Sequence, residues 1–121
     1  MQVYQKMLKD KVVYLQLGAN LEAEAASGDM ELDIDCQKPL LEKVSSVFDS
    51  GSNVILDLKN VIYIDSSGLW SLFEAHKKSM QTNLKFILIN ITKDVRRVFD
   101  ITKMSSKFAI FNSLEEAEKA V

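Results

Sequence analysis

The sequence predicts one α/β domain whose mixed β-sheet is antiparallel at an N-terminal hairpin and parallel afterwards, with its helices mainly on one face. Two observations predict this fold class. From Pro39 onwards, short apolar runs alternate with apolar residues at helical spacing, a pattern typical of parallel strands joined by helical crossovers. The length of 121 residues and the hydrophobic content of 47% are typical of a single globular domain. We therefore expect one domain over residues 1–121.

The N-terminal part contains two β-like segments and one segment that is poor in bulky apolar residues. Residues 3–8 and 12–17 are rich in strand-favouring residues and predict a hairpin. Residues 20–35 are rich in Ala, Glu and Asp, and predict an exposed loop or a short irregular helix. From Pro39, apolar residues spaced by three and four predict a helix, with the proline in or near its first turn.

The rest of the chain alternates apolar strands with amphipathic helices. Apolar runs predict strands over residues 53–58, 85–91 and 108–111, and a further apolar segment over 61–64. Helical spacing and capping signals predict helices over residues 69–80, 92–101 and 113–121. Thr92 is the expected cap of one helix, and Ser113 with Glu116 has capping-box spacing at another. The expected core includes Val54, Leu56, Leu69, Leu72, Phe86, Leu88 and Phe99.

Charge and composition argue against several partners and compartments. The net charge is −2, from 15 basic and 17 acidic residues, so we expect no nucleic-acid partner. The apolar runs are too short to span a bilayer and the N-terminus has no signal-peptide block, so we expect a cytoplasmic protein without direct membrane insertion. The single cysteine, Cys36, fits a reducing compartment.

The residue counts also weaken most enzymatic interpretations. His76 is the only histidine, which excludes metal sites with two histidines, and none of the four glycines forms a phosphate-binding loop. We expect no cofactor, no metal and no catalytic residue. A small hydrolase that uses Ser66 and His76 requires two side chains ten residues apart to meet, although one helix separates such positions by about 15 Å.

One motif, Asp65-Ser66-Ser67-Gly68, follows an apolar segment and begins an amphipathic helix. It has two interpretations. Asp65 or Ser66 could simply cap the helix, with Gly68 permitting close packing. Alternatively, a hydroxyl at the helix N-terminus could receive a phosphate, because free N–H groups and the helix dipole stabilise an anion there.

Residues 54–69 resemble the phosphorylation-site signature of STAS domains, in particular bacterial anti-sigma factor antagonists. That signature combines a strand ending in Leu-Asp-Leu, an apolar link and Asp-Ser-Ser-Gly-Leu. Residues 95–102 resemble a later helix of these antagonists, and residues 38–44 resemble their first helix. The resemblance extends from about residue 36 to about residue 112.

The resemblance implies a regulatory binding module without enzymatic activity. In this family the unphosphorylated antagonist binds an anti-sigma factor serine kinase and thereby frees a sigma factor, phosphorylation inactivates it, and a serine phosphatase restores it. The phosphate acceptor corresponds to Ser66, with Ser67 as a secondary candidate. The expected partner-binding residues are Asp33, Asp65, Gly68, Leu69 and Trp70.

The chain departs from the family pattern at three places. Trp70 stands where a glycine is usual, and either fills a gap in the core or its margin, or enlarges the partner contact. Met30 occupies the glycine position of the family's Gly-Glu-Leu-Asp turn, which leaves Ala19–Met30 as an apparent insertion. We expect this insertion to be exposed and more mobile than the sheet. Lys103 replaces a further glycine, which concerns local turn geometry.

A second interpretation keeps the fold without the phosphorylation switch. The chain would then be the STAS subunit of a lipid-transporting ABC system or part of a signalling scaffold, and Ser66 would cap a helix beside a protein interface. Neither interpretation fixes an oligomeric state.

Overall fold

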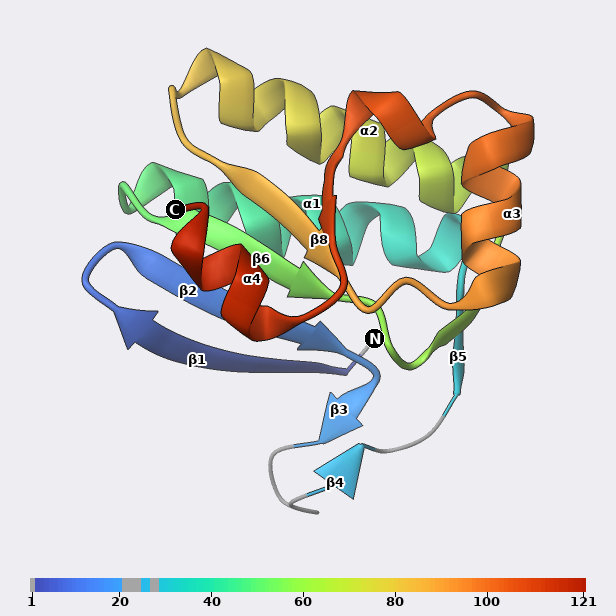
Figure 1. The fold of residues 1–121 in the computed structure, drawn as a ribbon, viewed down its shortest axis with the longest axis horizontal. Helices are drawn as coiled ribbons and strands as arrows, with labels where there is room; N and C mark the ends of the chain where they lie inside the picture. Colours follow the sequence, from blue (N-terminus) through green and yellow to red (C-terminus); the bar gives the residue numbers. More distant parts are fainter. Residues whose placement is uncertain (1, 21–24, 27–28) are drawn as a thin grey trace.

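A five-stranded mixed sheet forms the centre of the fold, with the strand order β1-β2-β6-β8-β9 (Figure 1). The computed structural model describes residues 2–20, 25–26 and 29–121. Strands β1 and β2 pair antiparallel, and the other neighbours pair parallel. The strands of this sheet are β1 Val3–Lys9, β2 Val12–Leu17, β6 Asn53–Asp57, β8 Phe86–Ile89 and β9 Ala109–Phe111. The predicted fold class is therefore confirmed.

Two small strand pairs and four helices complete the described part of the chain. The short strands β3 (Ala19–Asn20) and β4 (Ala25–Ala26) pair antiparallel, whereas β5 (Met30–Leu32) pairs parallel with β7 (Val61–Ile64). The helices are α1 Ile34–Asp49, α2 Ser66–Gln81, α3 Lys93–Ile101 and α4 Leu114–Lys119, and η2 (Ser105–Lys107) is a 3-10 turn.

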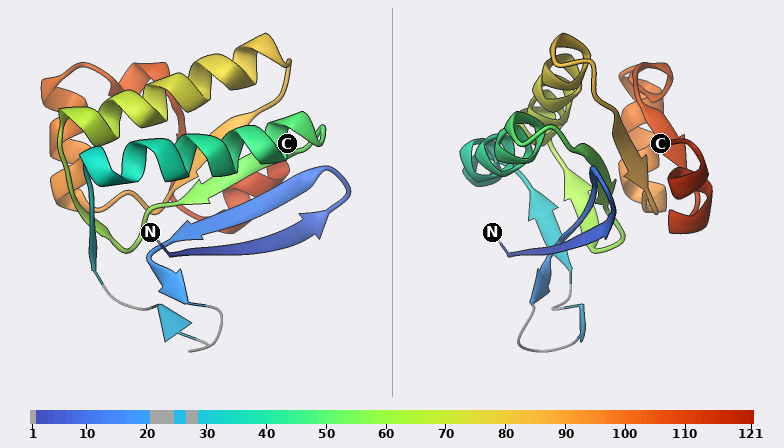
Figure 2. Two further views of the ribbon diagram at one scale, coloured as in Figure 1. Left: turned by 180° about the vertical axis from the view of Figure 1, so that it is seen from behind. Right: turned by 90° about the vertical axis from the view of Figure 1, so that its left-hand side faces the viewer.

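The helices cover the two faces of the sheet unequally. Helices α1 and α2 lie side by side over one face, and the short helix α4 lies on the other (Figure 2). The strands consequently bury both sets of alternating side chains: Val54 and Leu56 face the cluster beneath α1 and α2, and Ile55 packs in the cluster around α4. All seven expected core residues belong to the first cluster, so that prediction is confirmed.

The first helix begins earlier than the sequence predicts. Helix α1 begins at Ile34, so Pro39 is its sixth residue rather than part of its first turn. Asp33 caps the helix by accepting a hydrogen bond from the backbone N–H of Asp35. Pro39 is exposed, so its ring adds no strain to the core, although it removes one backbone hydrogen bond from the helix.

The prediction of a loop or irregular helix over residues 20–35 is also wrong in part. Strand β5 lies in this segment, and Leu32 is fully buried in the core. The local sequence conceals this strand because its pairing partner, β7, lies about thirty residues further on. Within the expected insertion, Asp29 is exposed and Met30 is half-buried; residues 21–24 and 27–28 lie outside the described residues, so its mobility stays a prediction.

Two capping predictions differ from the structure in detail. Thr92 is the N-cap residue of α3, but its hydroxyl donates to the carbonyl of Val61 at 2.8 Å and so ties α3 to β7. Ser113 caps α4 as expected, accepting from the Glu116 N–H at 3.2 Å. In a capping box the carboxylate of Glu116 would accept from the N–H of Ser113. Here it accepts from the N–H of Asn112, one residue earlier.

Candidate functional site

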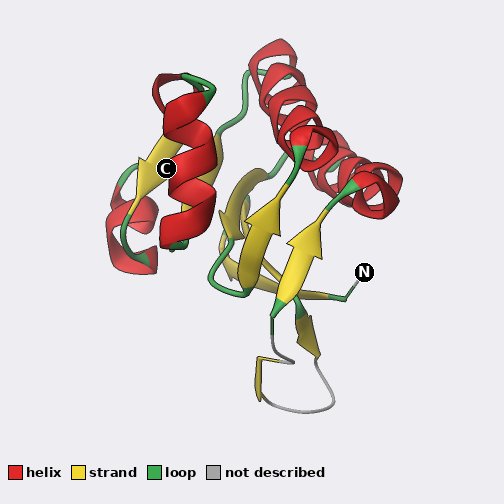
Figure 3. Cartoon of the chain, turned by 90° about the vertical axis from the view of Figure 1, so that its right-hand side faces the viewer, coloured by secondary structure: helices red, strands yellow, loops and turns green. Residues whose placement is uncertain are grey.

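The paired strands β5 and β7 bring the N-termini of two helices together. The strands run in the same direction, with Leu32 opposite Ile64, and each leads directly into a helix: β5 into α1 and β7 into α2 (Figure 3). The residues that follow the strands, Asp33 and Asp65, are therefore the N-caps of neighbouring helices. This end of the helix pair contains the Asp-Ser-Ser-Gly motif.

The sequence left open whether Asp65 or Ser66 caps α2, and in the structure the cap is Asp65. Its Oδ1 accepts from the Gly68 N–H at 3.0 Å, and its carbonyl accepts from the Leu69 N–H at 3.0 Å. Ser66 is the first helical residue and is exposed. Among the described residues, its hydroxyl has no hydrogen-bond partner, so capping does not account for this serine.

Gly68 permits a close approach between α2 and the end of β5. A Cβ atom at this position would lie 2.1 Å from the carbonyl oxygen of Leu32 and 2.9 Å from Cγ1 of Ile64. The same carbonyl oxygen accepts from the Asp65 N–H at 3.3 Å. Only a residue without a side chain fits here, which confirms the expected packing role of the glycine.

A side chain from α1 makes a second tie to the motif. Gln37 Nε2 donates to the carbonyl of Ser67 at 3.3 Å, and the Ser67 side chain is half-buried. Ser66, one residue earlier, is exposed. The two neighbouring serines therefore differ in accessibility. The role of Gln37 was not predicted, because nothing in the sequence shows which face of α1 meets α2.

The electrostatics of this end of the molecule have two opposing parts. The first-turn N–H groups of Ser66 and Ser67 have no partner among the described residues, and the helix dipole places partial positive charge there. Asp33, Asp35 and Asp65 add formal negative charge nearby. A hydroxyl in this position can accept a phosphoryl group that the helix end helps to stabilise.

The partner-binding candidates differ widely in exposure. Leu69 and Gly68 are buried, and Asp33 and Asp65 are half-buried. Trp70 is 48% exposed and belongs to neither apolar cluster, so it does not fill a gap in the core. It lies one helical turn after Ser66 and therefore on the same side of α2.

Further exposed apolar side chains occur on the elements that lead into this site. They are Ile34 at the start of α1, and Ile62 and Tyr63 on β7. The exposure of Ile62 and Tyr63 was not predicted, because residues 61–64 form one continuous apolar run. In the structure only the first and last residues of this run are buried. A run without alternation cannot show which side chains face outwards.

His76 is a half-buried residue at the margin of the core. Its ring packs edge-on against Phe108 with 5.6 Å between the ring centroids, and burial lowers the pKa of its imidazole. Its Nδ1 is buried without a hydrogen-bond partner in the described structure. Ser66 and His76 both belong to α2, ten residues or about 15 Å apart along the axis, so they form no catalytic pair.

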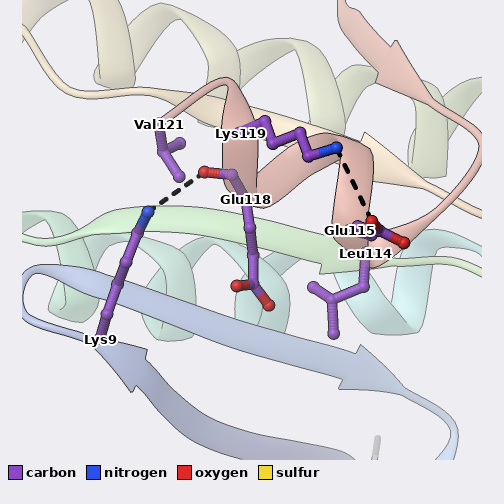
Figure 4. A pocket seen from close by; sticks show the side chains of 6 residues that line it. All are labelled: Lys9, Leu114, Glu115, Glu118, Lys119 and Val121. Carbon is purple, nitrogen blue, oxygen red and sulfur yellow. Dashed lines mark hydrogen bonds and ion pairs between the residues drawn. The ribbon is translucent and has the colours of Figure 1, made fainter.

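A cleft of about 600 Å³ lies on the other side of the molecule, between β1 and α4 (Figure 4). Three of its four charged side chains form a hydrogen bond or an ion pair. Lys9 Nζ donates to the carbonyl of Glu118 at 3.1 Å, and Lys119 pairs with Glu115 at 3.7 Å. Among the described residues, no cluster of three or more metal-ligating side chains occurs. Within the described structure, the Glu118 carboxylate is the one charged side-chain group of the cleft without a partner.

Comparison with known proteins identifies the family. The model of the STAS domain matches residues 28–117, and the chain belongs to this family. A similar sequence is BtrV of Bordetella bronchiseptica, which carries the name of an anti-sigma factor antagonist and is 36% identical over 67 residues. That match covers 55% of this chain and 58% of BtrV, so it spans little more than half of the relative.

Two solved structures illustrate the shared fold. An anti-sigma factor antagonist of Thermotoga maritima has a TM-score of 0.80 at 24% identity, covering 98% of this chain and 93% of that one. The Bacillus cell-fate determinant SpoIIAA in its phosphorylated form has a TM-score of 0.68 at 16% identity, covering 99% and 100%. No helix within residues 2–20, 25–26 and 29–121 is long and apolar enough to cross a membrane.

The close approach at Gly68 predicts the effect of adding one methyl group. Gly68→Ala should lower the free energy of unfolding by about 2 kcal/mol or more, because the new Cβ must displace the backbone of Leu32. Ser67→Ala in the same turn is the control and should stay within about 0.5 kcal/mol. Urea denaturation measures both. Since alanine is the better helix former by about 1 kcal/mol, a Gly68→Ala variant more stable than the wild type by that amount would show that β5 does not constrain α2.

The partly buried imidazole predicts a pH dependence of stability. Because the pKa of His76 in the folded protein lies below its ordinary value of 6.5, the unfolded chain takes up the proton first as pH falls. The free energy of unfolding should therefore decrease from about pH 7.5 to about pH 5.5. Urea denaturation of His76→Gln at both pH values should show a smaller decrease. An equal decrease in the variant would mean that other groups cause it.

Proposed function

We propose that this chain is an anti-sigma factor antagonist that binds an anti-sigma factor kinase in its unphosphorylated state and releases it after phosphorylation on Ser66. Binding of the kinase would free a sigma factor, and a serine phosphatase would restore the antagonist. The chain would act as a substrate and binding module rather than as an enzyme. The family membership and the name of BtrV support the regulatory role.

The exposure of Ser66 is the single observation that carries this proposal. Its hydroxyl lies at the first position of α2, is accessible to solvent, and serves no capping bond within the described structure. Its neighbour Ser67 is less exposed and its carbonyl is held by Gln37. One of the similar solved structures, SpoIIAA, is itself in a phosphorylated form.

A phosphate on Ser66 would act through charge rather than through refolding. It would add a charge of about −1.5 to −2 to a surface that already contains Asp33, Asp35 and Asp65. A partner that docks here must remove this group from water and approach it with its own charges. Reducing partner occupancy from about 99% to about 50% requires a ~100-fold loss of affinity, or about 2.7 kcal/mol. A dianion within an interface is sufficient for a change of this size.

The first prediction from this proposal separates the two serines. Ser66→Ala should fold normally, within about 0.5 kcal/mol of the wild type, because Asp65 provides the cap. Incubated with the cognate kinase and ATP, wild type and Ser67→Ala should gain the mass of one phosphate, whereas Ser66→Ala should gain none. Ser66→Ala should also keep its affinity for the kinase.

Three outcomes would contradict the phosphorylation switch. The first is undiminished phosphorylation of Ser66→Ala, and the second is phosphorylation that depends on Ser67. The third is equal partner affinity before and after phosphorylation of the wild type, which would favour a scaffold or transporter-associated STAS subunit without a switch. Intact mass and isothermal titration calorimetry measure these quantities.

The second prediction concerns the exposed tryptophan. Trp70→Ala should weaken kinase binding by ~30-fold, about 2 kcal/mol, because a half-exposed tryptophan beside the acceptor serine has the properties of an interface anchor. Its removal should change the free energy of unfolding little, since the side chain lies outside both apolar clusters. Met80→Ala, an exposed apolar residue near the other end of α2, is the matched control and should bind normally. Equal affinities of the two variants would exclude Trp70 from the interface.

A further inference from the structure

The surface around α3 carries a positive charge that the rest of the chain does not share. Residues 93–107 contain five cationic and two acidic side chains, a net charge of +3. Since the whole chain has a net charge of −2, the remaining residues together carry −5. We call residues 93–107 the α3 surface. Its cations are Lys93, Arg96, Arg97, Lys103 and Lys107, its acidic residues are the exposed Asp94 and Asp100, and Ile101 is an exposed apolar residue.

The cations of the α3 surface are unpaired. Within the described parts of the chain, none of the five lies within 4.0 Å of a carboxylate oxygen. The carboxylate of Asp100, on the same helix, instead accepts from the Ser105 hydroxyl. Four lysines elsewhere in the described structure, Lys78 with Asp49 among them, do form ion pairs. Arg97 is exposed and Arg96 is half-buried, and neither guanidinium has a carboxylate partner among the described residues that would compete with an external one.

The core holds α3 in a fixed orientation. Val95 and Phe99 are fully buried, and the Thr92 hydroxyl fastens the start of the helix to β7. On the outer side, Arg97 and Ile101 are one turn apart, and Ile101 is 73% exposed. A large apolar side chain in water beside unpaired guanidinium groups has no role in the core.

We propose that the α3 surface is a docking site for an acidic segment of a protein partner, with carboxylates that pair with Arg96 and Arg97 and an apolar side chain that covers Ile101. Arginine suits this role because its planar guanidinium can bind a carboxylate through two parallel hydrogen bonds. This interaction does not involve Ser66 and goes beyond the proposed function.

The charge distribution favours a short acidic segment over an extended polyanion. DNA or an anionic membrane would also approach the residues that carry −5, and these would oppose binding. The aromatic side chain within residues 93–107, Phe99, is buried and cannot stack on a base. A membrane would require more apolar surface than Ile101, the one exposed large apolar side chain within residues 93–107.

The test titrates the ¹⁵N-labelled full chain with a synthetic peptide of ~12 residues, in which glutamates flank a central leucine, at low ionic strength (~50 mM salt). Chemical-shift changes should concentrate in residues 93–107. The double variant Arg96→Gln/Arg97→Gln should weaken binding at least ~10-fold, as should replacement of the peptide's glutamates by glutamine. Ile101→Ala should weaken it by a smaller factor.

The matched control is Lys6→Gln/Lys11→Gln, which removes two exposed charges from the β1–β2 hairpin (Figure 1). Its peptide affinity should equal that of the wild type. Equal weakening by both double variants, shift changes centred elsewhere, or tighter binding of a ~20-base DNA or of phosphatidylglycerol vesicles would each overturn the proposal. So would a dimer of the free chain that Arg96→Gln/Arg97→Gln abolishes, because the occupant would then be a second copy.

A further variant separates this proposal from the phosphorylation switch. Ser66→Asp should bind the acidic peptide as tightly as the wild type, because Ser66 lies outside the α3 surface. A ~10-fold loss in this variant would place Ser66 within the peptide site and overturn the proposal of an independent surface. The readout requires neither kinase nor phosphate, so it gives a result whether or not Ser66 is phosphorylated.

Discussion

The contact between the carbonyl of Leu32 and Gly68 is the constraint on which the candidate site depends. Strand β5 can end against the first turn of α2 only because residue 68 has no side chain. The pairing of β5 with β7 then fixes the N-termini of α1 and α2 next to each other, and Gln37 adds a hydrogen bond between the two helices. Ser66 is thus an exposed hydroxyl on a helix start that these contacts hold in place, so the proposed phosphorylation would change the surface charge without unfolding the domain.

Helix α2 keeps the proposed phosphate acceptor apart from the residues that stabilise the fold. Leu69 and Leu72 face the core, whereas Ser66 and Trp70 face outwards, so the outer pair can be modified or substituted without opening the apolar cluster. The α3 surface follows the same principle, because Val95 and Phe99 fix the helix and leave its cations free. The −5 charge outside α3 gives the molecule two electrostatically different regions. A partner could therefore be oriented by charge before it contacts Trp70.

Much of the architecture could be predicted because its signals are local. Apolar runs such as residues 53–58 and the spacing around Leu69 mark buried strands and helices directly. Strand β5 was missed because it depends on distant pairing with β7. The start of α1 at Ile34 was missed although its cap, Asp33, is a local signal. The motif was recognisable from its residues and the family resemblance, and the role of Ser66 as phosphate acceptor stays a prediction. The exposure of Ser66 and the outward position of Trp70 depend on how α1 packs against α2, which the sequence alone does not show.

Intact-mass analysis with peptide mapping, on the protein isolated from its native cells, tests the central claim most directly. If Ser66 is the regulatory acceptor, a fraction of the chain should carry one phosphate, on the peptide that contains Ser66. That fraction should change when the kinase or the phosphatase gene is deleted. A protein that remains unmodified under every growth condition, or one that carries the phosphate on another residue, would contradict the account.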